Sequence, residues 1–564
     1  PFNVFERLLS NVLGVSGGDL AGKVLAWVHE TLQSAAIDDA KRDADEILRL
    51  IGLLAATPGA PPQVERQRGF EAFGHLFRAL AAQGGVLLHV DDGQHVDAGS
   101  QDLLAYLSRE LLDFPAVIIV LTRPDSAVEE RYMVAAGDPK NPLIPAALAL
   151  APLKRAASRK LAARLCKGLR ISKPALEKLV ARADGNPLFL EEMLRATRDG
   201  GRRNARLPDS IRAVIGARID GLSEPERVVL QAASVVGREF WMGAVCAQPA
   251  VERLGPVVDR TLIRLERLRY ITRKVETWEG EVGWRFQSQM TQEVCYQLNV
   301  PSDMKTGHRA VADWLTSRPG ATPHAQVGMH LDRAGERDRA ADAYRAAGDA
   351  AIARFANKQA ASAYSRALTL QRSWESSQTD RVQLELGICL QHMGDPVKAN
   401  ELLESLVRRD DVSATVRARA LRYKARAAAW AGDTDKQMEL LNQAIRAGAE
   451  AELPERLFVA ADLAYALVRH GKVGKARKII DGAMGAAYQA DQLGPVLLPL
   501  AQLHQSESMW ARNQGRLTEA EASARAAIEL YDQLGYSLGV ATTRTSLSAL
   551  LRDMARYDEA VSVA

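Results

Sequence analysis

Two adjacent carboxylates, Asp91 and Asp92, follow a short apolar run in the sequence VLLHVDDGQHVD, residues 86–97. Such a run, ending in polar residues, is typical of a buried parallel strand. Ligands of open α/β sheets bind just beyond the carboxyl ends of such strands, and Mg²⁺ takes hard oxygen ligands, usually few of them from protein. The stretch therefore predicts a Walker B strand of a nucleotide-binding domain, with an ordinary Asp-Gly turn at Asp92 and Gly93 as the alternative.

The two carboxylates would have different roles in this interpretation. Asp91 would hold Mg²⁺ through water, and Asp92 would polarise the attacking water. Gln94 and Asp97 would support the loop that carries them. These four side chains are the centre of the predicted site.

Polar residues also follow the second expected strand and open a later helix. Thr122 and Arg123 come directly after residues 116–121, AVIIVL, where a polar side chain can sense the terminal phosphate; the alternative is a turn with a solvated arginine. Asn186 and Pro187 predict a helix N-cap followed by proline at the first helical position. Contact between these two residues and a nucleotide would come in addition to that cap.

The segment GGDLAGKV at residues 17–24 has the spacing of a phosphate-binding loop, G-x-x-x-x-G-K. However, Val24 stands where a serine or threonine hydroxyl should meet Mg²⁺. The segment also follows a helical pattern rather than a strand. We therefore interpret the match as coincidental and expect the phosphate loop upstream of Pro1, in a longer protein of which this chain is an internal part.

The elements that must position these residues form an α/β unit. Strands alternating with helices predict a βαβ arrangement and a parallel sheet, with a third short strand expected within residues 143–153. Residues 155–197 have a helical pattern and contain the box DGNPLFLEE. After a capping box at Ser223, helices followed by a hairpin near residues 270–286 suggest a small winged-helix domain.

Beyond about residue 306 the sequence predicts helices and no strand. Gly-Asp turns recur at Gly394 and Gly432, and Gly471 and Gly515 stand in similar settings. A spacing of about forty residues is typical of a solenoid of helical hairpins.

Composition gives no support to several other functions. The chain has 564 residues, 25% of them charged, and a formal net charge of +4. Acids and bases are interspersed, so composition gives no argument for nucleic acid or membrane, and no apolar run reaches membrane-spanning length. The four cysteines lack CxxC spacing, which indicates free thiols in a reducing cytoplasm. Arginines near residues 260–269 indicate a solvated face rather than a DNA-reading helix.

Several motifs in this order resemble one family. VLLHVDDGQHVD is similar to the Walker B of STAND-type signalling ATPases, in the bacterial branch linked to adenylate or guanylate cyclases, protein kinases or LuxR-type regulators. VIIVLTRPD resembles the sensor-1 strand of that branch, and DGNPLFLEEML resembles its GNPLFLEEL box. The stretch LPDSIRAVIGARIDGLSEPERVVLQAASVVGREF closely matches the segment that leads into its winged helix. The stretch FQSQMTQEVCYQLNVPSDMKTGHRAVADWL resembles the family's "FRHALTQEVAYESL…HRRVAEAL" stretch.

The resemblance implies a mostly α fold with an α/β portion. It implies a truncated P-loop NTPase-like sheet over residues 1–154, a helical lid over 155–222, a winged helix over 223–305 and a tetratricopeptide-like solenoid over 306–564. The cofactors would be ATP and Mg²⁺. Asp91 would be the magnesium aspartate, Asp92 the hydrolytic acid and Arg123 the sensor, and Pro187 would lie near the nucleotide base.

The implied function is an ATP-dependent switch that regulates an attached effector such as a nucleotide cyclase. The solenoid would sense a protein or peptide partner, DNA would be reached only through a domain outside this chain, and a homo-oligomer on activation is left open. Gln287 and Ser288 stand where the family often has Arg-His, and His95 where Trp is common. The alternatives are part of a LuxR-type transcription activator, or a tetratricopeptide scaffold with a degenerate nucleotide site.

Overall fold

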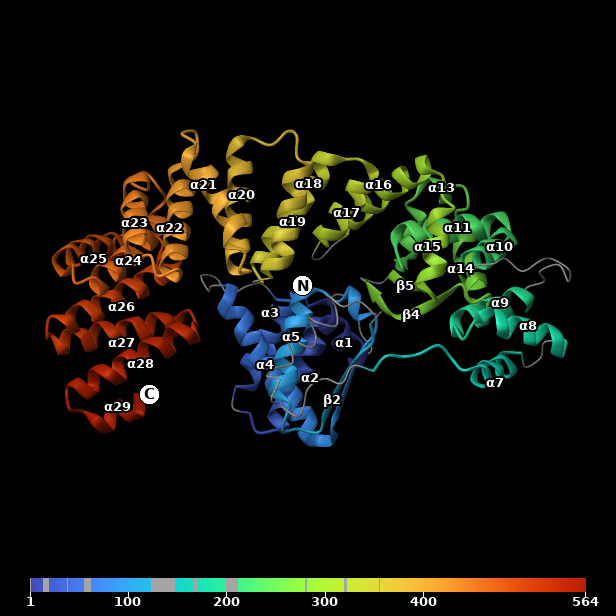
Figure 1. The fold of residues 1–564 in the computed structure, drawn as a ribbon, viewed down its shortest axis with the longest axis horizontal. Helices are drawn as coiled ribbons and strands as arrows, with labels where there is room; N and C mark the ends of the chain where they lie inside the picture. The colour runs from blue at the N-terminus through green and yellow to red at the C-terminus, as the bar shows by residue number, and fades with distance from the viewer. Residues whose placement is uncertain are drawn as a thin grey trace.

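The computed structural model describes residues 2–13, 20–37, 39–54, 62–122, 148–166, 171–198, 211–278, 281–318, 322–354 and 356–563. Most of these residues are helical. The helices after residue 211 form an arch, and the N-terminal unit lies on the concave side of that arch (Figure 1). None of the helices in the described part of the chain is long and apolar enough to cross a membrane.

The described part of the N-terminal unit combines five helices with two strands. Its elements are α1 (Asn3–Leu13), α2 (Leu20–Ser34), α3 (Ala40–Ile51), α4 (Pro62–Gly84), β1 (Val86–Val90), the 3₁₀ turn η1 (Gly93–His95), α5 (Ala98–Glu110) and β2 (Ala116–Val120). The two strands pair in parallel, with Val86 opposite Ala116 and Val90 opposite Val120. The predicted pair of parallel strands joined through a helix is therefore present.

The two-stranded sheet is buried on one face only. Leu88 and Val90 pack into the same core as Phe5 and Phe73, whereas Leu87 and Val117 are 68% and 55% exposed. The prediction of a strand buried on both faces is wrong for the described residues, because their helices pack against a single face of the sheet. Residues 148–153 form no strand, and residues 143–147 of the expected third strand lie outside the described part.

In the described residues between 148 and 220, four helices follow. They are α7 (Arg155–Leu165), α8 (Lys173–Ala183), α9 (Pro187–Arg198) and α10 (Ile211–Asp220). Apolar residues at helical spacing, among them Leu179, Leu190, Met193 and Val214, meet in one small core. The helices α7 to α9 lie at the side of the molecule, apart from β1 and β2 (Figure 1).

Residues 223–297 form a compact mixed unit, which we call the β3–β5 unit. It contains α11 (Glu224–Val236), β3 (Glu239–Trp241), α12 (Met242–Cys246), α13 (Pro249–Glu252), α14 (Val257–Arg267), β4 (Ile271–Trp278), β5 (Glu281–Phe286) and α15 (Gln289–Gln297). The strands form an antiparallel sheet in the order β3-β5-β4. The predicted capping box between Ser223 and Glu226 and the predicted hairpin are both present. Sequence reasoning missed β3, which has only three residues.

The rest of the described chain is a solenoid of helices with no strand. Its helices are α16 (Pro301–Ser317), α17 (His324–Ala334), α18 (Arg337–Ile352), α19 (Asn357–Leu370), α20 (Ser376–His392), α21 (Pro396–Arg408), α22 (Ala414–Trp430), α23 (Thr434–Ala447), α24 (Leu453–Arg469), α25 (Val473–Tyr488), the 3₁₀ turn η2 (Gly494–Val496), α26 (Leu497–Asn513), α27 (Leu517–Gln533), α28 (Ser537–Asp553) and α29 (Tyr557–Val563). The predicted tetratricopeptide-like helical solenoid is confirmed. Helix α16 runs across the domain boundary expected at residue 306.

Glycines with a left-handed backbone stand in the turn between the two helices of several solenoid hairpins. Gly394, Gly432, Gly471 and Gly515 have φ values of 79°, 77°, 70° and 73°. A residue without a Cβ adopts this conformation without strain, which explains why the turns recur at glycine. The corresponding turn before α29 has Ala555, with φ 58°.

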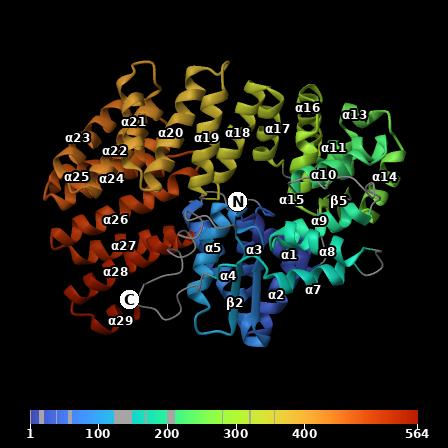
Figure 2. The same cartoon turned by 45° about the vertical axis from the view of Figure 1, so that its right-hand side comes forward.

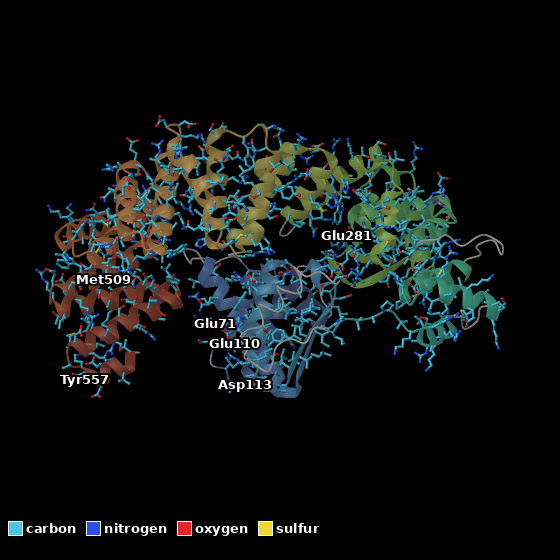
Figure 3. All side chains as sticks on the ribbon, viewed as in Figure 1. Glu71, Glu110, Asp113, Glu281, Met509 and Tyr557 are labelled. Atoms are coloured by element: carbon cyan, nitrogen blue, oxygen red, sulfur yellow. The ribbon has the colours of Figure 1, made fainter. Side chains whose placement is uncertain are left out.

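The β3–β5 unit and the solenoid both contact the N-terminal unit. Turning the molecule by 45° leaves α1 to α5 beneath the arch, with the solenoid above them (Figure 2). Glu71, Glu110 and Asp113 lie on the N-terminal unit, whereas Glu281 lies on the β3–β5 unit (Figure 3). Contacts between these parts therefore decide what surrounds the carboxyl end of β1.

Candidate functional site

The segment of residues 91–97 links the carboxyl end of β1 to α5. Asp92 has a left-handed backbone, with φ 55°, and opens the turn η1. The Gly93 N–H donates to the Leu121 carbonyl at 2.7 Å, which ties the turn to the end of β2. A Cβ on Gly93 would lie 2.6 Å from Cγ1 of Val120, so this close approach requires glycine.

Asp91 and Asp92 lie side by side at this end of β1. Asp91 is exposed, and its Oδ1 accepts the Asp92 N–H at 3.0 Å. Both carboxylate oxygens of Asp92 are engaged: Oδ1 accepts from Nε2 of Gln94 at 3.2 Å, and Oδ2 pairs with the Arg238 guanidinium. Partial burial acts to raise the pKa of Asp92, but the hydrogen bond and charge of Arg238 outweigh it, and the pKa lies below its ordinary value.

Thr122 joins the same cluster, because its Oγ1 donates to Oε1 of Gln94 at 3.4 Å. One glutamine thus connects the ends of β1 and β2. Arg123, the predicted sensor, lies outside the described residues.

Asn186 and Pro187 form the predicted helix cap. Oδ1 of Asn186 accepts the Phe189 N–H at 3.1 Å, and Pro187 is the first residue of α9. Gly185 is held against Leu153, whose N–H donates to the Gly185 carbonyl at 2.9 Å. Among the described residues, no hydrogen bond or ion pair joins Asn186 or Pro187 to Asp91 or Asp92, and α9 lies apart from β2 (Figure 1). Their contact with a nucleotide stays a prediction.

Asp97 is the most extensively bonded carboxylate of the segment. It caps α5 through bonds from the Ser100 N–H at 3.0 Å and Oγ at 2.6 Å. Its Oδ1 also accepts from the Phe2 N–H at 2.9 Å and from Nε2 of Gln359, at the start of α19, at 3.0 Å. Burial acts to raise the pKa of Asp97, and these hydrogen bonds hold it below its ordinary value.

Sequence reasoning missed Arg238 and Gln359, the two residues that reach this segment from other units. Arg238 lies 146 residues from Asp92, and Gln359 lies 262 residues from Asp97. No local sequence pattern predicts contacts between residues so far apart. The sequence offered only an arginine directly after a glycine, in the stretch SVVGREF. In the structure this Gly237 has a positive φ.

The donor set fits a hydrated Mg²⁺ ion at Asp91. No group of three or more metal-binding side chains occurs among the described residues. A magnesium ion bound with a nucleotide needs only one or two protein carboxylates, since water and phosphate oxygens complete its shell. The exposed Asp91 can supply one such oxygen, whereas both oxygens of Asp92 already have partners.

The phosphate-loop spacing at residues 17–24 begins after helix α1, and Lys23 and Val24 belong to α2. Residues 17–19 lie outside the described part. The described end of this segment is therefore helical and is preceded by a helix rather than a strand.

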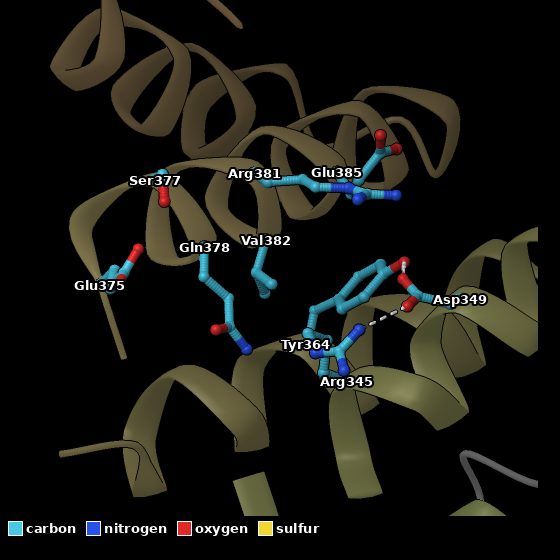
Figure 4. Close-up of a pocket in the computed structure, with 9 residues that line it drawn as sticks. All are labelled: Arg345, Asp349, Tyr364, Glu375, Ser377, Gln378, Arg381, Val382 and Glu385. Carbon is cyan, nitrogen blue, oxygen red and sulfur yellow. Dashed lines mark hydrogen bonds and ion pairs between the residues drawn. The ribbon is translucent and has the colours of Figure 1, made fainter. Parts of the chain in front are cut away.

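A second candidate site is a cleft of about 430 Å³ in the solenoid (Figure 4). Tyr364 of α19 forms its wall and donates to Oδ1 of Asp349 at 2.8 Å, and Arg345 donates to the other oxygen at 3.0 Å. Arg381 and Glu375 lie at the opposite side, on and just before α20, and both are exposed. Mixed charges beside an aromatic ring suit a polar peptide segment better than an apolar ligand.

No protein-family model matches this chain, and no curated protein matches it. Solved structures of similar architecture include a Signal Transduction ATPase with Numerous Domains (STAND) protein with a tetratricopeptide repeat sensor from Pyrococcus horikoshii. It is 14% identical, with a TM-score of 0.43, and the match covers 87% of this chain and 73% of that one.

Two further similar structures come from bacilli. The apo quorum sensor NprR from B. thuringiensis is 12% identical, with a TM-score of 0.34, covering 66% of this chain and 91% of its own. Aspartyl phosphate phosphatase F from Bacillus subtilis is 11% identical, with a TM-score of 0.34, covering 74% of this chain and 94% of its own. At these TM-scores the likeness carries no information on activity.

Proposed function

We propose that the chain is the switch and sensor portion of an ATP-dependent signalling protein. Its N-terminal unit takes part in binding ATP with Mg²⁺, its solenoid senses a protein or peptide partner, and together they regulate an attached effector such as a nucleotide cyclase. The observation that carries this proposal is the pair Asp91 and Asp92 at the carboxyl end of β1. The segment of residues 91–97 that contains this pair is bonded to the β3–β5 unit and to the solenoid.

Each carboxylate has a role that its surroundings support. The exposed Asp91 holds a water of the Mg²⁺ shell. Asp92, once its Arg238 partner has left, orients the attacking water and accepts its proton. Bound Mg²⁺ would neutralise charge on the phosphates. Gln94 links Asp92 to Thr122, so a movement at the end of β1 would also move the end of β2.

The switch needs contacts that differ between two states. Residues 91–97 supply them, because the same seven residues carry the two carboxylates, bond to Arg238 and accept from Gln359. We therefore assign to this segment the coupling between nucleotide and solenoid. In this proposal, residues 223–305 act as a winged-helix domain that moves with respect to the N-terminal unit.

ATP hydrolysis by the complete protein, expressed from its whole reading frame, tests the proposal. We expect Asp92→Asn to lower kcat about 100-fold or more, because the amide cannot accept a proton. The control is Asp113→Asn, an exposed carboxylate of the same unit. Equal kcat for wild type and Asp92→Asn would contradict the role of Asp92, and absence of ATP binding by the wild type would contradict the switch.

A second candidate function is a scaffold that binds peptides without hydrolysing ATP. The full engagement of Asp92 and the cleft of Figure 4 favour it. Peptide-array binding that is lost in Arg381→Glu, in a protein that binds no nucleotide, would support the scaffold over the switch.

A further inference from the structure

Arg238 lies where the β3–β5 unit contacts the N-terminal unit, and its backbone is bonded to β5. It stands between α11 and β3, after Gly237, and its carbonyl accepts the Phe286 N–H at 2.9 Å. This backbone bond anchors it to β5. Its side chain crosses to Asp92, so one arginine joins two units that are distant in sequence.

The Arg238 guanidinium is equipped to take a second anionic partner. Within the described part of the chain its Nε is buried and has no hydrogen-bond partner. A guanidinium binds phosphate through two parallel N–H bonds, and leaving a buried donor unpaired is unfavourable. An anion that satisfies Nε as well as the terminal nitrogens would therefore compete well with Asp92.

The surroundings carry more positive than negative charge. Next to Arg238, Glu239 is approached by Arg7 at 2.8 Å, Lys274 at 3.2 Å and Arg285 at 3.9 Å. With Arg238 itself, four cations face three carboxylates, those of Asp91, Asp92 and Glu239. A polyanion arriving at the carboxyl end of β1 would meet this excess of positive charge.

We propose that Arg238 is a positioning residue that exchanges Asp92 for a phosphate group of the nucleotide, and that this exchange releases residues 91–97 from the β3–β5 unit. The inference rests on the proposed function and adds to it the residue that reads whether the site is occupied. While Arg238 pairs with Oδ2 and Gln94 donates to Oδ1, the charge of Arg238 makes Asp92 a weaker base toward water. Once a phosphate group has replaced Asp92 as the partner of Arg238, Asp92 can orient the attacking water and accept its proton.

Hydrogen exchange of the peptide spanning residues 91–97 tests this inference in the complete protein. It is measured without ligand, with Mg²⁺ and ATP, and with Mg²⁺ and ADP. We expect ligand-free Arg238→Gln to exchange about tenfold faster than wild type in this peptide, because a charge-assisted bond is lost. Wild type should reach the faster rate with Mg²⁺ and ATP, and the variant should not respond further.

The matched control is Arg7→Gln, which removes a cation that joins the same two units through Glu239. It should leave exchange of residues 91–97 unchanged, and Arg238→Lys should restore part of the protection because it keeps the charge without the fork. Unchanged exchange in α4 (Pro62–Gly84) shows that the N-terminal unit of the variants is folded.

The outcomes separate the two proposals. Equal exchange of residues 91–97 in Arg238→Gln and Arg7→Gln overturns the role of Arg238, whether or not nucleotide binds. Faster exchange in Arg238→Gln together with no response of the wild type to ATP overturns the phosphate exchange. Absence of nucleotide binding by the wild type, measured by calorimetry, overturns the proposed function itself.

Discussion

Asp97 and the solenoid residue Asp433 both cap the helix that follows them, but they differ in their long-range hydrogen bonds. Each caps the helix that follows it, Asp97 through the Ser100 N–H at 3.0 Å and Asp433 through the Lys436 N–H at 3.0 Å. Within the described part of the chain, the Asp433 carboxylate makes no bond to a distant unit, whereas Asp97 also accepts from Phe2 and Gln359. The comparison teaches that a turn becomes a coupling element through its long-range partners rather than through its sequence type.

The same contrast holds for ion pairs. Many in the solenoid join residues three or four apart or neighbouring helices, for example Arg408 with Glu404 and Arg426 with Asp462. Arg7 with Glu239 and Arg238 with Asp92 instead join separate units. Exposed pairs contribute little to stability, so we expect the pairs between units to influence which arrangement the units adopt more than the stability of each unit.

The largest expected effect lies where the solenoid begins. Nδ1 of His308 lies 2.8 Å from Nδ1 of His330, and Tyr296 bonds to His308 at 2.8 Å. Burial lowers the pKa of His308 to about 3 and that of His330 to about 4, and the nearby Arg333 contributes to both. Both histidines are therefore neutral in the folded protein at pH 7. The contact between α16 and α17 depends on hydrogen bonds between neutral groups, whereas the segment of residues 91–97 depends on charged groups.

The sign of the pH dependence follows from these lowered pKa values. Below pH 6.5 the unfolded chain binds protons that the folded chain does not, so stability is complete above that pH and falls as the pH is lowered toward 4. We expect a loss of about 2 kcal/mol for each histidine between pH 7 and pH 5, measured by urea unfolding. In a variant with His308→Phe and His330→Leu this pH dependence should shrink; an unchanged slope would show that other groups cause it.

The next largest effect is expected from removing the Asp97 carboxylate, which tests the comparison of Asp97 with Asp433. Asp97→Ala removes a helix cap and leaves the Phe2 N–H and the Gln359 amide without their acceptor. We expect a loss of about 3 kcal/mol in the unfolding free energy of the N-terminal unit.

Asp433→Ala removes only a cap, so we expect a loss of about 1 kcal/mol from the solenoid. Urea titration followed by circular dichroism measures both variants. Similar losses in the two variants would mean that the long-range bonds of Asp97 add nothing to stability.

The smallest effect sharpens the account of the solenoid turns. Ala555 occupies the left-handed position that glycine holds in four earlier turns, and nothing lies within 4 Å of a Cβ placed on Gly432. Backbone strain alone should then decide the outcome. We expect Ala555→Gly to raise the unfolding free energy by about 1 kcal/mol and Gly432→Ala to lower it by a similar amount. Thermal unfolding measures both changes, and effects of the same sign would contradict this explanation.

Much of this architecture could be predicted from the sequence, because local patterns determine it. The apolar run at Val86, the capping box at Ser223 and the glycine-marked turns gave the strands, a helix start and the solenoid. The parts that could not be predicted are non-local. No periodicity indicates that Arg238 meets Asp92, that Gln359 meets Asp97, or that Leu87 and Val117 lie on an open face of the sheet.

The candidate site divides in the same way. Gln94 links Asp92 to Thr122 because the parallel strands β1 and β2 end at the same edge of the sheet, whereas the roles of these side chains toward a nucleotide stay predictions. Asn186 forms its predicted cap but lies on a helix apart from that edge. The arrangement of the α7–α10 helices relative to the sheet depends on contacts between surfaces that the sequence does not identify.

The most direct test of the central claim is the affinity of the complete protein for ATP with and without Mg²⁺, measured by calorimetry for wild type, Asp91→Asn and the control Glu110→Gln. We expect Mg²⁺ to lower the Kd for ATP in wild type and in Glu110→Gln. In Asp91→Asn the factor by which Mg²⁺ lowers this Kd should be smaller by about tenfold, which corresponds to about 1.4 kcal/mol. A gain from Mg²⁺ that is unchanged in Asp91→Asn would contradict a nucleotide site at the carboxyl end of β1.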